Sequence, residues 1–217
     1  MPLNTPTVLR RVAPRAHANY MEAFREGALL FEEHGITTPQ RMAHFLAQVM
    51  QETGRLRVLR ENMSYSAERM LVIFGVGRHS ARVTPAEAAR LAHHPEALAE
   101  RVYGLGNPGK AHELGNTEPG DGFRYRGNGI LQTTGRAAHR TAGAAVGLDF
   151  EGRTELVTAP EHALKPALHE WTAGNLNRFA DRDDLRTITR RINGGLNGLE
   201  ERQAFFRQLR PLLREVG

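Results

Sequence analysis

The sequence predicts a mostly helical protein that also carries a lobe of loops and short hairpins. Apolar side chains recur every three or four residues along several segments, as they do on one face of a helix. Nine glycines lie between Gly104 and Gly135, and a loop of that length inside a compact domain is usually functional or disordered. We therefore predict one domain over residues 1–217 with two lobes, the loop-and-hairpin lobe spanning roughly residues 104–135.

The bulk composition excludes several classes of protein. Hydrophobic residues make up 40% of the 217 residues and charged residues 24%, as in a globular domain with a substantial core. The absence of cysteine excludes disulfides, thiolate metal sites and thiol nucleophiles. No apolar run approaches the roughly 20 residues that span a bilayer, so we expect no stable membrane insertion.

The chain carries a formal charge of +5, and 27 of its 29 basic residues are arginine. This excess favours a polyanionic partner, which is nucleic acid, anionic lipid or an anionic cell-wall polymer. A GC-rich genome produces the same arginine bias, so the charge alone does not choose a partner.

The first predicted helix runs from His17 to His34, with Tyr20, Phe24 and Phe31 on one stripe and Gly35 as C-terminal cap. Four later segments begin with a Ser or Thr that can cap a helix N-terminus, and two of them carry a capping box. They are TTPQRMAHFLAQVMQ, AERMLVIF after Ser66, TPAEAARLAHH with Thr84 and Glu87, and TAPEHALKPALHEWTAGNLNRFA with Thr158 and Glu161. A final helix over roughly residues 199–214 would bury Phe205, Leu209 and Leu212.

One glutamate falls on an apolar helix face. On an unbroken helix Phe45, Val49 and Glu52 lie on the same side, where burial favours the protonated carboxyl that a general acid needs. The plainer interpretation is that Glu52 ends the helix and pairs with Arg55 or Arg57.

A second glutamate, Glu61, follows nine residues later, on the opposite side of any helix that runs through both. Gly54 can end the helix and let the chain turn back, so that both carboxyls line one cleft. Acidic pairs of this kind define most glycoside hydrolases, but two glutamates nine residues apart are a weak signal on their own.

Three segments together resemble the family 19 glycoside hydrolases, in the branch of phage and bacterial endolysins, which are lysozymes. FLAQVMQETGRLRVLRENMSYSAERM resembles the family segment that carries the catalytic acid. GNTEPGDGFRYRGNGILQTTGR is similar to the stretch GDG.RYRGRG.IQLTGR, and ITRRINGGLNGLEERQAFF to the element ITRRINGG.NG. The segments keep the family's order and span roughly residues 15–214. The resemblance implies a mainly α, lysozyme-like two-lobed fold with a small β part and a deep substrate cleft.

The resemblance also implies roles for the matching residues. Glu52 matches the general acid that protonates the glycosidic oxygen, and Glu61 matches the general base that activates the attacking water. Thr134 falls where the family has a hydroxyl that helps hold this water, Gln132 matches a cleft-lining glutamine, and Asn193 matches an asparagine that hydrogen-bonds the sugar. The implied course is inversion, with the two carboxyls about 6.5–9.5 Å apart.

Other residues are left open by the resemblance. Tyr125 either packs in the core or binds a sugar ring, and one of Arg190 and Arg191 is a candidate for orienting the acidic pair. We take Tyr125 and Arg191 as candidate substrate-binding residues. Asn128 replaces an arginine of the family and Ala138 an asparagine, which affects substrate detail more than activity.

We expect hydrolysis of the β-1,4 bonds between N-acetylmuramic acid and N-acetylglucosamine in peptidoglycan, leading to bacterial cell lysis. Anionic peptides and wall polymers attract a +5 protein, whereas chitin is neutral. The alternatives are a chitinase acting on chitin oligomers and, in a different class, a basic nucleic-acid- or wall-binding protein without catalysis. The basic residues are scattered and form no nucleic-acid-binding signature, which argues against nucleic acid.

The expected partner is the glycan strand of peptidoglycan, with no nucleic acid, and the chain is expected to be a monomer. We predict no metal and no other cofactor, because hydrolysis by two carboxyls needs none. The N-terminus lacks the apolar core of a signal peptide. We therefore expect synthesis in the cytoplasm and action in the periplasm or cell wall, after holin-type release or delivery by a secretion system.

Overall fold

The computed structural model describes residues 3–216, and the chain divides into two compact units. The first unit takes the chain up to Leu59, then Gly129–Gln132, and then the chain from Glu155 onward. The second unit takes Arg60–Asn128 and Thr133–Thr154. The lobe predicted over residues 104–135 therefore belongs mostly to a larger unit that begins at Arg60. That the whole chain forms one catalytic domain stays a prediction.

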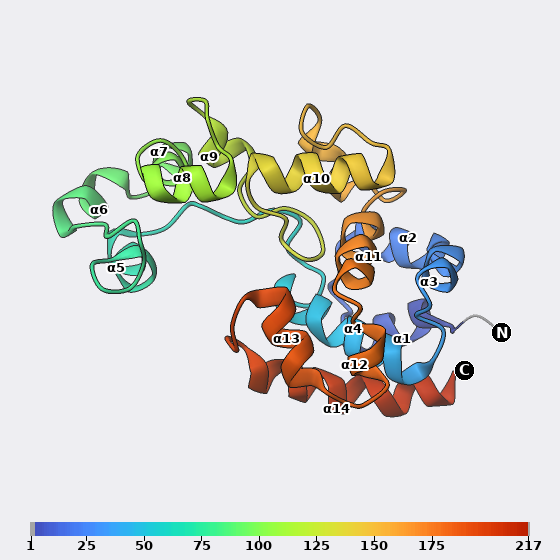
Figure 1. Cartoon of the computed structure of the whole chain (residues 1–217). Helices are drawn as coiled ribbons and strands as arrows, with labels where there is room; N and C mark the ends of the chain where they lie inside the picture. The colour runs from blue at the N-terminus through green and yellow to red at the C-terminus, as the bar shows by residue number, and fades with distance from the viewer. Residues whose placement is uncertain (1–2, 217) are drawn as a thin grey trace. The chain divides into compact units, whose positions relative to one another are not determined.

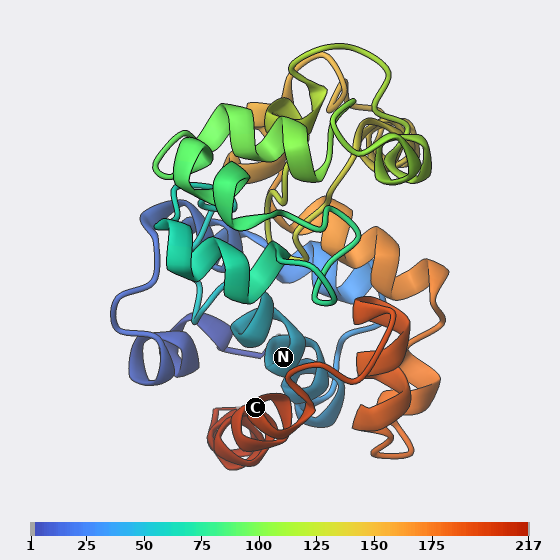
Figure 2. The ribbon, with the colours of Figure 1, turned by 90° about the vertical axis from the view of Figure 1, so that its left-hand side faces the viewer.

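The first unit is built from eight helices and a 3-10 helix within the described residues. Figure 1 shows α4 and α14 side by side, and Figure 2 shows α14 nearly end-on beside α4. The elements are α1 (Thr5–Val12), α2 (Ala18–Glu26), α3 (Ala28–Glu33), α4 (Pro39–Glu52), η1 (Thr154–Thr158), α11 (Leu164–Ala173), α12 (Asn177–Ala180), α13 (Leu185–Asn193) and α14 (Leu199–Glu215).

The centre of this unit is α4. Every residue from Met42 to Met50 is buried, and a helix that is buried all round belongs in the core of a protein. The Trp171 ring of α11 packs edge-on against Phe45, with the ring centroids 5.4 Å apart. The apolar face of α14 covers another side of α4, which fixes the place of the last turn of α4.

The second unit has its own core and is also helical. Its helices are α5 (Ala67–Phe74), α6 (Pro85–Leu91), α7 (Pro95–Val102), α8 (Pro108–Leu114), α9 (Asp121–Arg124) and α10 (Arg136–Val146) (Figure 1). Met70, Phe74, Leu98 and Val102 are among the buried residues that fill it. Within residues 3–216 the β structure consists of isolated bridges, Arg60 with Asn128, Gly75 with Val83 and Asn128 with Thr133.

Several predicted helix starts are confirmed. The Thr38 side chain accepts the Arg41 amide at the start of α4, and Ser66 accepts the Arg69 amide at the start of α5. The capping box at the start of α6 is complete. Gly35 has a φ of 67°, as expected of a glycine that follows a helix end.

Other predicted boundaries are wrong for reasons of packing. The helix expected from His17 to His34 breaks at Gly27, where a Cβ would lie 2.3 Å from Cδ1 of Leu164. The helix expected from Thr158 begins only at Leu164, because the Thr158 hydroxyl donates to the Glu155 carbonyl instead of capping.

The hairpins expected between residues 104 and 135 are also largely absent. This segment forms α8 and α9, and the one tight reversal described there is the bridge between Asn128 and Thr133. Glycines in this segment serve close helix contacts as well as turns, since a Cβ on Gly122 would lie 2.5 Å from the Ala99 carbonyl oxygen. Within residues 3–216, no helix is both long and apolar enough to cross a membrane.

Candidate active site

Glu52 is held by a buried arginine. It is the last residue of α4, and its Oε1 accepts a 2.5 Å hydrogen bond from Nη2 of Arg202 on α14. The side chain of Arg202 is 2% exposed and that of Glu52 is 17% exposed. Nη1 of Arg202 donates to Oε1 of Gln48, one turn earlier on α4, at 2.8 Å. Arg202 therefore fixes the carboxyl of Glu52, and the pairing of Glu52 with Arg55 or Arg57 is not found.

The last glycine of the INGGLNG segment, Gly198, lies against α4 where α14 begins. Gly198 precedes the first residue of α14 with a φ of 71°, a conformation that favours glycine. A Cβ at Gly198 would lie 2.7 Å from Nε2 of Gln51, the neighbour of Glu52. On the other side, Nε2 of Gln48 donates to the Thr189 hydroxyl of α13 at 3.4 Å. Two helices, α13 and α14, thus contact the C-terminal part of α4.

A second carboxyl, Glu170 on α11, belongs to the same charged cluster. Burial first, and the negative charge of Glu52 second, raise the pKa of Glu170 from 4.5 to about 7. Near neutral pH Glu170 therefore retains its proton in a large fraction of molecules. Glu52, paired with Arg202, therefore has a second carboxyl near it that is partly neutral at this pH.

Glu61 lies in the second unit and is held by neutral donors. Its Oε1 accepts a 3.0 Å hydrogen bond from the Tyr103 hydroxyl, and its Oε2 accepts the Gly127 amide at 3.4 Å. Burial raises the pKa of Glu61, while these two hydrogen bonds and the charge of Arg126 oppose the rise. The net effect is a more basic carboxylate than a solvated glutamate.

The RYRG segment positions the backbone of Glu61. The Glu61 amide donates to the Gly127 carbonyl at 2.7 Å, and Nε of Arg126 donates to the Glu61 carbonyl at 3.0 Å. Two residues that flank this segment, Asp121 and Arg136, form a partly buried ion pair, in which Nη2 of Arg136 lies 2.6 Å from Oδ1 of Asp121. The charged residues of this motif therefore act as supports within the second unit.

The remaining predicted polar residues have these surroundings. Thr134 is half-buried and lies in the second unit with Glu61. Gln132 belongs to the first unit, where it adopts a φ of 53° and its Nε2 donates to the Gly129 carbonyl at 2.9 Å. Asn193 ends α13 and its Nδ2 lies 3.5 Å from a backbone carbonyl four residues on. Their contacts with water or sugar stay predictions, as does the distance between the two carboxyls.

The prediction that Tyr125 binds a sugar ring is wrong. Its side chain is 1% exposed, and its hydroxyl donates to the Glu151 carbonyl at 3.0 Å. The ring packs against His139, with the ring centroids 5.2 Å apart. A ring enclosed in this way has no free face for a sugar.

The prediction that Arg190 or Arg191 orients the acidic pair is wrong for Glu52, because its partner is Arg202. Nη1 of Arg191 donates to the Gly174 carbonyl at 3.1 Å, and the exposed guanidinium lies over the Phe179 ring. Contact between Arg191 and substrate stays a prediction.

The sequence interpretation missed Arg202 and Glu170, although a signal was present for both. Arg202 lies on the stripe of α14 that buries Phe206, Leu209 and Leu213, as Glu52 does on the stripe of α4. Glu170 falls between the buried residues Leu168 and Trp171. In both cases the signal is a charged residue among the apolar residues of a helix face.

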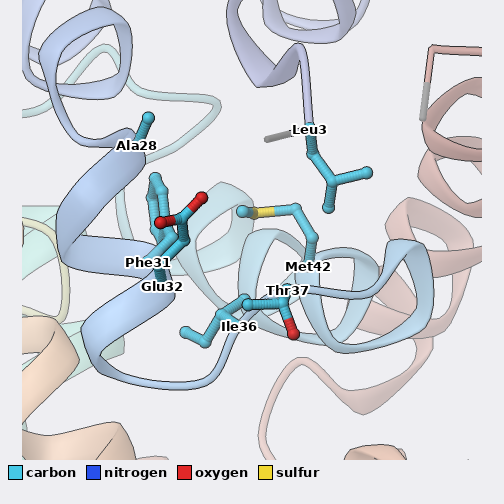
Figure 3. A pocket seen from close by; sticks show the side chains of 7 residues that line it. All are labelled: Leu3, Ala28, Phe31, Glu32, Ile36, Thr37 and Met42. Atoms are coloured by element: carbon cyan, nitrogen blue, oxygen red, sulfur yellow. The ribbon is translucent and has the colours of Figure 1, made fainter. Parts of the chain in front are cut away.

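In the described part of the chain, the predicted site residues belong to no metal site and do not line the small cavity of the first unit. No group of three or more His, Asp or Glu side chains between residues 3 and 216 is placed to hold a metal ion. A cavity of about 40 Å³ in the first unit involves none of the predicted site residues (Figure 3). Its walls are Leu3, Ala28, Phe31, Glu32, Ile36, Thr37 and Met42.

No family model matches the chain. A protein of Haemophilus influenzae described as a glycosyl hydrolase family 19 domain-containing protein is 32% identical over 180 residues, 82% of each chain. The chain belongs to glycosyl hydrolase family 19. The resemblance carried by the three segments is thereby confirmed, and this family 19 protein is a glycoside hydrolase with a glycan substrate.

Solved structures support the family's fold. Chitinase C from Streptomyces griseus HUT6037 matches with a TM-score of 0.59 and 20% identity, over 96% of this chain and 91% of that one. A mutant of chitinase C matches with a TM-score of 0.62 and 19% identity, over 96% of this chain and 76% of that one. The predicted mainly α fold of the family 19 glycoside hydrolases is confirmed.

The ion pair between Arg202 and Glu52 can be tested with a double-mutant cycle. Arg202→Met should lower the free energy of unfolding of this hydrolase by about 3–5 kcal/mol, because it leaves the Glu52 charge without its partner. In a Glu52→Gln background the same substitution should cost clearly less. Fluorescence of Trp171, the single tryptophan, reports unfolding of the first unit in urea. Arg207→Met, at an exposed position of the same helix, is the matched control, and equal costs in both backgrounds would contradict the pairing.

Glu170 should make stability depend on pH. Its pKa is higher in the folded than in the unfolded chain, so the unfolded chain loses this proton first as the pH rises. The free energy of unfolding should therefore fall between about pH 4.5 and about pH 7, by on the order of 3 kcal/mol from this group. Glu170→Gln should remove most of that fall in urea unfolding curves at pH 5 and pH 8. The exposed Glu201→Gln should keep it, and identical curves for both variants would refute the assignment.

Proposed function

We propose that this glycoside hydrolase is a lysozyme of the endolysin type. It hydrolyses the β-1,4 bonds between N-acetylmuramic acid and N-acetylglucosamine in peptidoglycan, with inversion, and so lyses bacterial cells. The observation that carries the chemistry is that Glu52 and Glu61 are each built into a polar site of a different kind. Arg202 pairs with the first carboxyl, and neutral donors hold the second.

Glu52 acts as the general acid. It gives its proton to the glycosidic oxygen as the bond to the leaving sugar breaks, and it is left as a carboxylate. The guanidinium of Arg202 stabilises the carboxylate that forms, and the partly buried position of the pair strengthens this attraction. The raised pKa of the neighbouring Glu170 lowers the fraction of molecules that carry a second negative charge near Glu52 at neutral pH.

Glu61 acts as the general base. It takes a proton from the water that attacks the anomeric carbon, so it must be ionised before each turnover. The raised pKa of Glu61 makes the carboxylate a stronger base, and activity should decline at low pH as this residue becomes protonated. The hydroxyl of Thr134 is proposed to orient the same water.

The charge of the chain favours peptidoglycan over chitin. A net charge of +5 and an isoelectric point of about 10.2 attract the carboxylates of wall peptides and the phosphates of wall polymers. Chitin carries no charge, so this electrostatic attraction does not favour its binding. The second candidate is a chitinase, which the structural likeness to chitinase C favours. We propose that the enzyme reaches the wall through a holin or a secretion system.

Glu52→Gln and Glu61→Gln test the assignment of both roles. Each should reduce hydrolysis by about 10²–10⁴-fold while circular dichroism stays unchanged, because each removes one proton transfer and little volume. The assay is turbidity loss of outer-membrane-permeabilised Gram-negative cells, followed by mass spectrometry of the digest. Glu200→Gln, at an exposed position, is the control and should match wild type.

The products separate the candidate activities. Reducing-end N-acetylmuramic acid, rather than its anhydro form, is the outcome expected of a hydrolytic lysozyme. Release of chitin oligomers from chitin without any lysis would replace the lysozyme by a chitinase. Inactivity of wild type on both substrates would leave a wall-binding protein and would refute the catalytic assignments.

A further inference from the structure

The turn that follows Glu52 is strained and tightly held. Gly54, Arg55 and Leu56 all have positive φ angles, of 54°, 65° and 61°. Such angles are unfavourable for the two residues that carry side chains, and strain of this kind persists only where the surroundings impose it. Here the Leu56 side chain is fully buried and its amide donates to the Thr53 hydroxyl at 2.7 Å. As predicted, the helix ends beside Gly54, and the Arg55 side chain is exposed.

The loop between α1 and α2 is tied to this turn. The His17 amide donates to the Leu56 carbonyl at 2.7 Å, and Nη1 of Arg55 donates to the Val12 carbonyl at 3.1 Å. Two segments about forty residues apart in sequence are therefore held together by hydrogen bonds within the first unit. The two loops form a fixed surface.

Between these loops lies a hollow of about 270 Å³ with three arginines on its wall. Arg55 is fixed by the Val12 carbonyl and by the Phe205 ring beneath it, 4.9 Å from its guanidinium carbon. Nε of Arg57 donates to the Gly54 carbonyl at 2.8 Å. The full lining is Val12, Ala13, Pro14, Arg15, Arg55 and Arg57.

The three guanidiniums keep most of their hydrogen-bonding capacity. Each has five N–H donors, and among residues 3–216 none of Arg15, Arg55 and Arg57 has a carboxylate partner. Arginine that is partly fixed by one hydrogen bond presents a planar fork that matches a carboxylate or another oxyanion. Arg55 and Arg57, each held by one such hydrogen bond, are therefore preorganised for a group with more than one negative oxygen.

The position of the hollow links it to the substrate. Arg55 is three residues after Glu52, so its backbone is within about 11 Å of the proposed acid. A peptide attached to the sugar chain near Glu52 extends by about 3.3 Å per residue and reaches this distance within a few residues. Peptidoglycan carries short acidic peptides on alternate sugars, whereas chitin carries none.

We propose that the hollow lined by Arg15, Arg55 and Arg57 binds the carboxylates of the peptides that branch from a peptidoglycan strand. This inference rests on the proposed lysozyme function. It adds a site that makes the enzyme prefer glycan strands that carry peptides. The hollow recognises the peptide and takes no part in bond cleavage.

The test compares three soluble glycan oligomers of equal length. One carries peptides with free carboxylates, one carries the same peptides with amidated carboxylates, and one has had its peptides removed. Arg15→Gln/Arg57→Gln should raise KM about tenfold on the first oligomer, the effect of losing exposed charge-assisted contacts, with kcat unchanged. KM on the other two should change less than twofold. Arg15→Glu should raise KM on the first oligomer further, and Arg90→Gln/Arg186→Gln is the charge-matched control at exposed positions outside the hollow.

The outcomes separate this inference from the proposed function. Equal KM values for the double variant and the control on the first oligomer, or the same increase on all three, would overturn the inference while the enzyme remains a lysozyme. If wild type cleaves no oligomer, the proposed function fails, and calorimetric titration with the free acidic tetrapeptide decides the inference by itself. Weaker binding of the tetrapeptide by the double variant supports the hollow, and unchanged binding refutes it. Displacement of the tetrapeptide by inorganic phosphate at equal concentration would also overturn the peptide assignment.

Discussion

The architecture of the first unit depends on one buried guanidinium. A cation as deeply buried as the Arg202 guanidinium needs a partner inside the protein, because an unpaired buried cation is very costly in free energy. Glu52 and Gln48, one turn apart on α4, accept hydrogen bonds from it. The same contacts align α14 with α4, the two longest helices of the described chain, and hold a carboxyl at the end of α4. The packing of α14 on α4 and the placement of the proposed acid therefore depend on the same interaction.

The second unit holds its carboxyl by a different physical means. Around Glu61 the closest donors are a tyrosine hydroxyl and a backbone amide, while the charge of Arg126 acts from a guanidinium bonded to the backbone carbonyl of Glu61. In the proposed mechanism, the positive charge of Arg202 stabilises the carboxylate that Glu52 becomes once its proton has passed to the leaving sugar. Burial raises the pKa of Glu61 although its hydrogen-bond donors oppose the rise, and a more basic carboxylate suits a group that must take a proton from water. The proposed division into acid and base thus follows the kind of partner that each glutamate has.

Local rules predicted much of this structure, and tertiary contacts decided the rest. Capping residues located the starts of α4, α5 and α6, since a cap depends only on the next three residues. The break at Gly27 depends on contact with Leu164, and the spacing of apolar residues along one helix gives no information about that contact. In the same way, an apolar stripe identified Glu52 as unusual, but its pairing with Arg202 joins residues 150 positions apart in sequence. Tyr125 was ambiguous because an aromatic ring in a glycine-rich motif suits either a core or a sugar, and only its burial in the folded chain separates the two.

The roles proposed for Glu52 and Glu61 are tested most directly by the configuration of the first product. An acid and a base that acts through water give inversion, whereas a carboxylate that attacks the sugar itself gives retention. Proton nuclear magnetic resonance in the first minutes of a digestion of soluble glycan oligomer distinguishes the new reducing ends before they equilibrate. The α-anomer should appear first from the β-1,4 bond. Initial release of the β-anomer would contradict the assignment of Glu61 as a base that acts on water.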